Sequence, residues 1–175
     1  MGPAMGPAMA TGPALTAESR RPALTRGTVL GFAAGLVLNP VFKVVTARRG
    51  IAGATALAER IGGSSPLGTT SRYDVHRARR IAGGVHLAAR VPPVDVVCLP
   101  RSLTLWCLLR RRGIPASLLI GVGDATGVFG AHAWVRVHDA DVGEDPAQIA
   151  QYAAFADPVL GAPDRVHGGR GDRVR

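Results

Sequence analysis

Two residues in the second half of the sequence have side chains that can do chemistry together, Cys98 and His132. Cys98 comes just before a predicted helix, where backbone N–H groups stabilise a thiolate and can also hold an oxyanion. A thiolate at this position can attack a carbonyl carbon, with His132 as the base that removes its proton. Taken singly, each residue has an alternative interpretation, a structural cysteine and an ordinary exposed strand histidine.

A carboxylate must orient the imidazole if these residues form a triad. Four acidic residues follow the histidine closely: Asp139, Asp141, Glu144 and Asp145. A residue on the neighbouring strand can face His132 directly, which favours Glu144 or Asp145 over the two residues of the predicted turn.

Zinc binding is the rival chemistry, with Cys98, Cys107, His132 and His138 as the available donors. Eight residues separate the two cysteines, a spacing that does not fit a zinc knuckle. We therefore expect no metal and no cofactor. A helix between the cysteines holds them about 13 Å apart, too far for a disulfide, and Cys107 is interpreted as a core residue. The remaining histidines, His76, His86, His138 and His167, have no setting comparable to that of His132.

The elements around the two reactive residues are predicted to be a helix followed by strands. Apolar residues spaced three and four apart predict a helix over residues 101–112. Apolar and β-branched runs predict strands at 116–122 and 131–137, joined by a glycine-rich turn, and then a short strand at 142–145 and a short helix in 147–155. This order predicts an α+β fold, with a small antiparallel sheet packed on a helix.

The first half of the chain is predicted to be helical and to hold no catalytic constellation. Helices are expected at 29–38, at 52–61 and at 73–89. Asn39-Pro40 stops the first of them, although 41–47 could resume it, and Gly83-Gly84 weakens the last. The predicted organisation is a disordered tail at 1–25, a helical N-terminal region at 26–90, a catalytic core at 91–160 and a disordered tail at 161–175.

Composition limits the partners and the compartment. The 175 residues include 21 Lys and Arg against 12 Asp and Glu, which gives a net charge of +9. This charge suits an acidic peptide or nucleic acid, but no basic patch interleaved with aromatic residues supports nucleic-acid binding. Sparse cysteines indicate the cytoplasm. The motif Ser19-Arg20-Arg21 only vaguely resembles an export signal, and the apolar run at 29–38 is too short to span a bilayer.

Three stretches together resemble one family. They are Cys-Leu-Pro-Arg-Ser-Leu at 98–103, Gly-Ile-Pro at 113–115 and His-Ala-Trp-Val at 132–135. Their order and spacing resemble the C-terminal domain of the lasso-peptide maturation proteases, the microcin-processing B proteins, over residues 90–146. The resemblance implies a transglutaminase-like, papain-like cysteine protease core.

The resemblance also implies a function and a set of partners. The protein would remove the leader from a ribosomally made lasso-peptide precursor, acting with a separate leader-peptide-binding protein and an ATP-dependent lasso cyclase. Cys98 and His132 fall on the family nucleophile and histidine. The family's third member is usually aspartate, and its position is Glu144 here, with Asp145 beside it as the alternative. A non-catalytic peptide-binding module of the same fold and a basic nucleic-acid-binding protein are the other hypotheses.

Overall fold

The computed structural model describes residues 24–63, 72–92, 96–124 and 129–161. In chain order the elements are α1 (Arg26–Gly62), α2 (Arg72–Ala89), α3 (Cys98–Arg110), β1 (Ser117–Asp124), β2 (Phe129–Val137), β3 (Ala140–Val142), α4 (Pro146–Ile149) and β4 (Tyr152–Ala154). The predicted α+β class with an antiparallel sheet is therefore confirmed. The Ser19-Arg20-Arg21 motif and all but residues 24, 25 and 161 of the two predicted tails lie outside the described residues.

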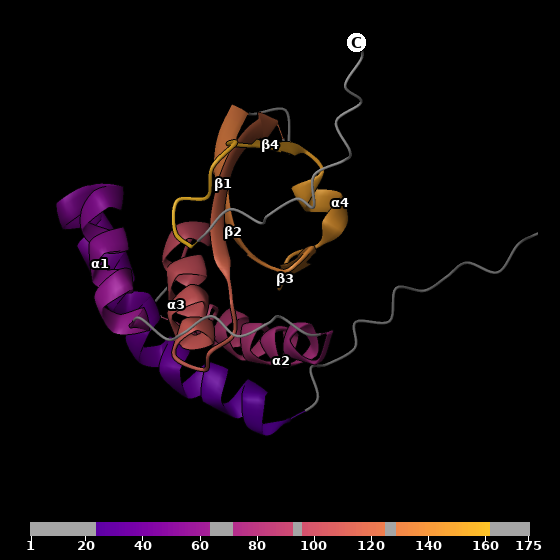
Figure 1. The fold of residues 1–175 in the computed structure, drawn as a ribbon. Helices are drawn as coiled ribbons and strands as arrows, with labels where there is room; N and C mark the ends of the chain where they lie inside the picture. Colours follow the sequence, from indigo (N-terminus) through magenta and orange to yellow (C-terminus); the bar gives the residue numbers. More distant parts are fainter. Residues whose placement is uncertain (1–23, 64–71, 93–95, 125–128, 162–175) are drawn as a thin grey trace, which may run out of the picture.

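The sheet has four strands in the order β3-β2-β1-β4, and every pairing in it is antiparallel. β1 and β2 form the long central hairpin, whereas β3 pairs with β2 only at Val135, Arg136 and Val137. The helices α1 and α3 lie on one side of this sheet and α4 lies on the other, while α2 runs across the end of the sheet near β3 (Figure 1).

Alternation along β2 divides the apolar residues between two clusters. Val135 and Val137 belong to the main core, which α3 shares through Leu103 and Leu109. Trp134 points to the opposite face and packs with a smaller group, Leu119, Ile149 and Tyr152. The strand predicted at 131–137 is thus confirmed.

The predicted stop at Asn39-Pro40 is wrong, because α1 continues through Pro40 to Gly62 and kinks at Gly50, where φ is 66°. Packing against α2 explains why the helix persists. Asn39 is buried, and its side-chain amide donates a hydrogen bond to the carbonyl of Val85 at 3.3 Å. Tertiary contacts of this kind outweigh the single backbone hydrogen bond that a proline removes.

Glycines allow α1 and α2 to pack with their backbones in near contact. A Cβ atom at Gly31 would lie 2.2 Å from the carbonyl oxygen of Ile81, and one at Gly84 would lie 2.0 Å from that of Thr28. Gly84, which weakened the sequence-based prediction of the helix at 73–89, is therefore a packing position within α2.

Because α1 does not stop at Pro40, its apolar part is longer than the run at 29–38 that was compared with the thickness of a bilayer. By length and composition, this 37-residue helix is apolar enough to cross a membrane, and 28% of its apolar window is buried in the structure. A buried core helix and a signal sequence near the N-terminus satisfy the same criteria.

Three element boundaries near the site differ from the predictions. The helix predicted to begin at residue 101 begins at Cys98, because Pro100 lies in its first turn, where no backbone N–H is needed. The third strand is Ala140–Val142 instead of 142–145. The helix predicted within 147–155 is confined to Pro146–Ile149, and Tyr152–Ala154 forms a strand that pairs with the free edge of β1.

Candidate active site

Cys98 is the first residue of α3, and its thiol is half-buried beside the imidazole of His132. Burial by itself raises the pKa of a thiol. Hydrogen bonds to the His132 side chain and to the backbone of Ala133 and Leu99 outweigh this effect, so the pKa of Cys98 lies below its usual value of 9.0. The Cys98 thiol therefore loses its proton more readily than a free cysteine does, chiefly because of its contact with His132.

His132 lies near the middle of β2 with its side chain only 8% exposed. Its ring stacks with those of Trp134 and Tyr152, at centroid separations of 6.0 and 5.0 Å. The contact with Cys98 first, and that with Glu144 second, raise the pKa of His132 to about 9 despite the opposing effect of burial. The imidazole is therefore held in place and favours the protonated form at neutral pH.

Glu144 faces His132 from the turn that follows β3. Its Oε2 lies 3.7 Å from Nε2 of His132, slightly beyond hydrogen-bond length, so Nε2 is buried without a partner. Nε2 is therefore the ring nitrogen that faces the carboxylate. Burial raises the pKa of Glu144, but His132, Arg101 and His86 together hold it below its usual value.

The other predicted carboxylates have different partners. Asp145 caps the start of α4, where its Oδ1 accepts a hydrogen bond from the Ala147 backbone at 2.9 Å. Asp141 accepts hydrogen bonds from Trp134 and Arg136, and Asp139 is an exposed residue beside His138. Of the four candidates, Glu144 is the one that the structure places against His132.

Two residues in this site were not expected from the sequence, Arg101 and His86. Nη2 of Arg101 lies 2.7 Å from Oε1 of Glu144, and Nε2 of His86 lies 3.8 Å from the same oxygen. Burial first, and the charge of Arg101 second, lower the pKa of His86 to about 4, so it is neutral at pH 7. His86 therefore differs from His132 in protonation, but it shares the carboxylate of Glu144 with it, which the sequence did not indicate.

The sequence contains a signal for only one of these two residues. Arg101 lies three positions after Cys98 on the same helix, so the two side chains share a face of α3. His86 comes from α2 and is brought in by tertiary packing alone. Gly143 allows this approach, since a Cβ there would lie 2.9 Å from Ala82 and 3.1 Å from Nε2 of His86.

The start of α3 docks on a stretch of β2 that β3 does not cover. β3 pairs with β2 no further than Val135. Beyond that point the hydroxyl of Ser102 donates a hydrogen bond to the carbonyl of Ala133 at 2.8 Å, and the backbone of Ala133 also contacts the Cys98 sulfur. These bonds fix the helix start against the strand that carries His132.

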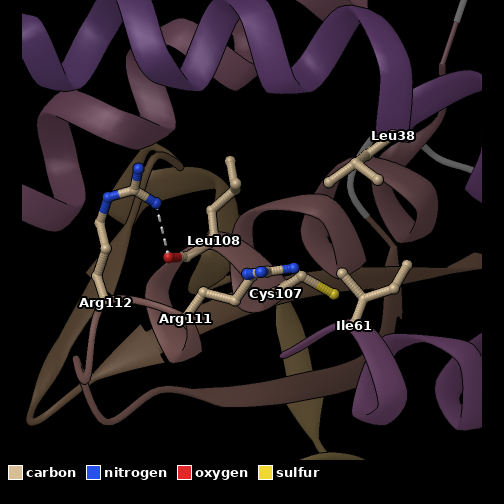
Figure 2. A pocket seen from close by; sticks show the side chains of 6 residues that line it. All are labelled: Leu38, Ile61, Cys107, Leu108, Arg111 and Arg112. Carbon is tan, nitrogen blue, oxygen red and sulfur yellow. Dashed lines mark hydrogen bonds between the residues drawn. The ribbon is translucent and has the colours of Figure 1, made fainter. Parts of the chain in front are cut away.

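Cys107 has a different environment at the other end of α3. Both cysteines are free, as predicted. Cys107 is fully buried, its thiol donates to the carbonyl of Ala58 at 3.4 Å, and burial raises its pKa to about 12. It lines a cavity of about 360 Å³ together with Leu38, Ile61, Leu108, Arg111 and Arg112 (Figure 2). Burial and the raised pKa both disfavour the Cys107 thiolate, and this cavity is separate from the site at Cys98.

Among the described residues, no three His, Cys, Asp or Glu side chains form a group that could hold a metal ion. The family model described as "Transglutaminase-like superfamily" matches residues 41–157, more than half of the chain. The match begins within α1, ends just after β4 and includes every residue of the site. No curated protein and no solved structure matches the chain.

Proposed function

The chain belongs to the transglutaminase-like superfamily, which includes cysteine peptidases, and we propose that it is a peptidase with Cys98, His132 and Glu144 as its catalytic triad. The observation that carries the proposal is the order of contacts. A thiol at a helix start contacts an imidazole whose Nε2 faces a buried carboxylate. This arrangement meets the requirements for a base-activated nucleophile with an orienting third group.

The chemistry follows from the protonation states that this arrangement favours. His132 takes the proton of Cys98, and the charge of Glu144 stabilises the resulting imidazolium. The thiolate attacks the carbonyl carbon of the scissile peptide bond, while backbone N–H groups at the start of α3 stabilise the oxyanion. His132 then protonates the leaving amine, and water hydrolyses the thioester to release the acyl fragment and regenerate the thiol.

We further propose that the substrate is the precursor of a lasso peptide and that the bond cleaved joins its leader to its core. Support comes from the stretch at 98–103 that resembles the lasso-peptide proteases. In the structure its residues connect the parts of the site: Cys98 contacts His132, Arg101 binds Glu144, and Ser102 joins α3 to β2. The motif is thus the segment that assembles the triad.

Within this proposal, the protein acts in the cytoplasm beside two other proteins. A separate leader-peptide-binding protein would present the precursor, because the N-terminal region is formed by the helices α1 and α2 and includes no strand among its described residues. An ATP-dependent cyclase would then join the amine released by cleavage to an acidic side chain of the core peptide.

The test measures how two variants, each lacking one cysteine, cleave a precursor peptide that is encoded next to the gene for this protein. The leader-binding protein is present in each reaction. The protein and Cys107→Ala are expected to release the leader, because Cys107 lies in the core away from the site. Cys98→Ala is expected to release none. Cleavage by Cys98→Ala at the rate of the unmodified protein would show that Cys98 is not the nucleophile.

A further inference from the structure

Four arginines surround a second cavity, at the opposite end of α3 from Cys98. The cavity measures about 550 Å³ and lies where the start of α1, the first turns of α2 and the segment after α3 meet. Its charged lining consists of Arg26, Arg77, Arg80 and Arg112. Tyr73, Leu30 and Ile81 form much of the rest of its wall.

Positive charge in this cavity is poorly compensated. The lining residues include no Asp or Glu. Arg77 pairs with Asp74 at 3.7 Å, and the Arg77 side chain is 43% exposed, so this ion pair contributes little. Burial first, and the charges of Arg77 and Arg111 next, lower the pKa of Arg112. The guanidinium groups therefore repel one another and favour the arrival of an anion.

The start of α1 adds to the positive potential. Arg26 is the first residue of this helix, and no acidic residue occupies its first turn. The side chain of Thr25 accepts a hydrogen bond from the backbone N–H of Thr28, which satisfies one of the unpaired donors. Free N–H groups and the helix dipole give such a terminus a partial positive charge.

We propose that this cavity binds a small molecule that carries phosphate groups. Guanidinium groups match phosphate oxygens through paired hydrogen bonds, and several of them converging on one concavity suit a compact, highly charged anion. The volume is that of an ordinary small-molecule site. Tyr73, whose ring lies 5.9 Å from the guanidinium carbon of Arg77, offers an aromatic surface at the rim.

This inference does not depend on peptidase activity. Cys98 begins α3, whereas Arg112 follows its last residue, so the length of that helix separates the two sites. Arg112 also lines the cavity of Figure 2, where its guanidinium donates a hydrogen bond to the carbonyl of Leu108 at 3.1 Å.

The test measures binding of inorganic pyrophosphate to the full chain by isothermal titration calorimetry. Arg77→Gln and Arg80→Gln each remove one lining charge, and Arg79→Gln is the matched control, since Arg79 is exposed on the same helix and does not line the cavity. The unmodified protein is expected to bind one pyrophosphate. Each lining variant should weaken the affinity by about tenfold or more, the effect of losing a charge-assisted hydrogen bond.

The control variant should bind pyrophosphate within about twofold of the unmodified protein, a difference well under 1.4 kcal/mol. Absence of pyrophosphate binding would overturn the assignment. Equal losses of affinity in all three variants would also overturn it, because the positive charge of the whole surface, and not this cavity, would then attract the anion. A hexaglutamate peptide forms a second arm of the experiment. If it binds more tightly than pyrophosphate and with the same dependence on Arg77 and Arg80, the cavity recognises acidic peptide and the phosphate assignment is wrong.

Discussion

Arg101 and His132 lie on opposite sides of one carboxylate. Nη2 of Arg101 is 2.7 Å from Oε1 of Glu144, while Oε2 of Glu144 is 3.7 Å from Nε2 of His132. The Glu144 side chain is only 7% exposed, so water screens these contacts weakly. Arg101 therefore acts as a positioning residue, since it holds one oxygen of the carboxylate and leaves the other directed at the imidazole.

Arg101→Gln is expected to slow the alkylation of Cys98 at pH 7 by about threefold to tenfold, the effect of shifting the thiol pKa by up to about one unit. Without the guanidinium, Glu144 turns more freely and stabilises the imidazolium less. Arg101→Lys keeps the charge but not the planar fork and should recover part of the rate. A pH profile of iodoacetamide labelling measures the shift. A profile unchanged in Arg101→Gln would mean that Arg101 serves folding alone.

Glu144→Gln and Asp145→Asn separate the two candidates for the third member of the triad. Glu144→Gln should lower precursor cleavage by at least about tenfold, because the amide cannot stabilise the imidazolium. Asp145→Asn should leave the rate unchanged, because Asp145 caps α4 and does not face His132. Initial rates at saturating precursor provide the comparison. If Asp145→Asn proves to be the impaired variant, the assignment of Glu144 is incorrect.

His86 makes the protein less stable in acid. Its pKa of about 4 in the folded protein lies below the unfolded value of 6.5, so the unfolded chain binds a proton that the folded chain excludes. Stability from this group is present above pH 6.5 and is lost as the pH falls towards 4, by at most about 3 kcal/mol. Urea unfolding at pH 7 and pH 4.5 should show a smaller acid loss in His86→Gln than in the unmodified protein. Equal losses in the two proteins would argue against a buried, neutral His86.

Gly84→Ala tests the close approach of α1 and α2. Alanine in a helix usually adds about 0.5–1 kcal/mol of stability over glycine. Here the new Cβ would lie 2.0 Å from the carbonyl oxygen of Thr28, so the helices must move apart. We expect the free energy of unfolding to fall by about 1–3 kcal/mol, as for other overpacked positions. A stabilised Gly84→Ala protein would contradict the helix contact described above.

Local sequence patterns predicted the helix and the hairpin that carry Cys98 and His132. They did not single out these two residues, which were paired through the family resemblance. The same resemblance indicated Glu144, which lies in the turn after β3 and not in the strand predicted at 142–145. Asp145 remained an alternative, because adjacent carboxylates in a turn differ only in where their side chains point.

Features fixed by tertiary packing were not predictable in the same way. Pro40 lies inside α1 because contacts with α2 hold the helix together, and no local pattern encodes those contacts. Residues 152–154 form a strand because β1 has a free edge beside them. His86 reaches Glu144 from a helix far away in the sequence, through an approach that Gly143 permits. Each outcome depends on segments that meet only in the folded chain.

The central claim is that Cys98 exists as a thiolate paired with His132, and the rate of its alkylation at pH 7 tests this most directly. Iodoacetamide labelling followed by intact-mass and peptide mass spectrometry distinguishes Cys98 from the buried Cys107. We predict rapid labelling at Cys98 alone. In His132→Gln, the labelling rate of Cys98 should fall by at least about tenfold. Labelling of Cys98 no faster than that of an unstructured peptide thiol, with no change in His132→Gln, would contradict the account.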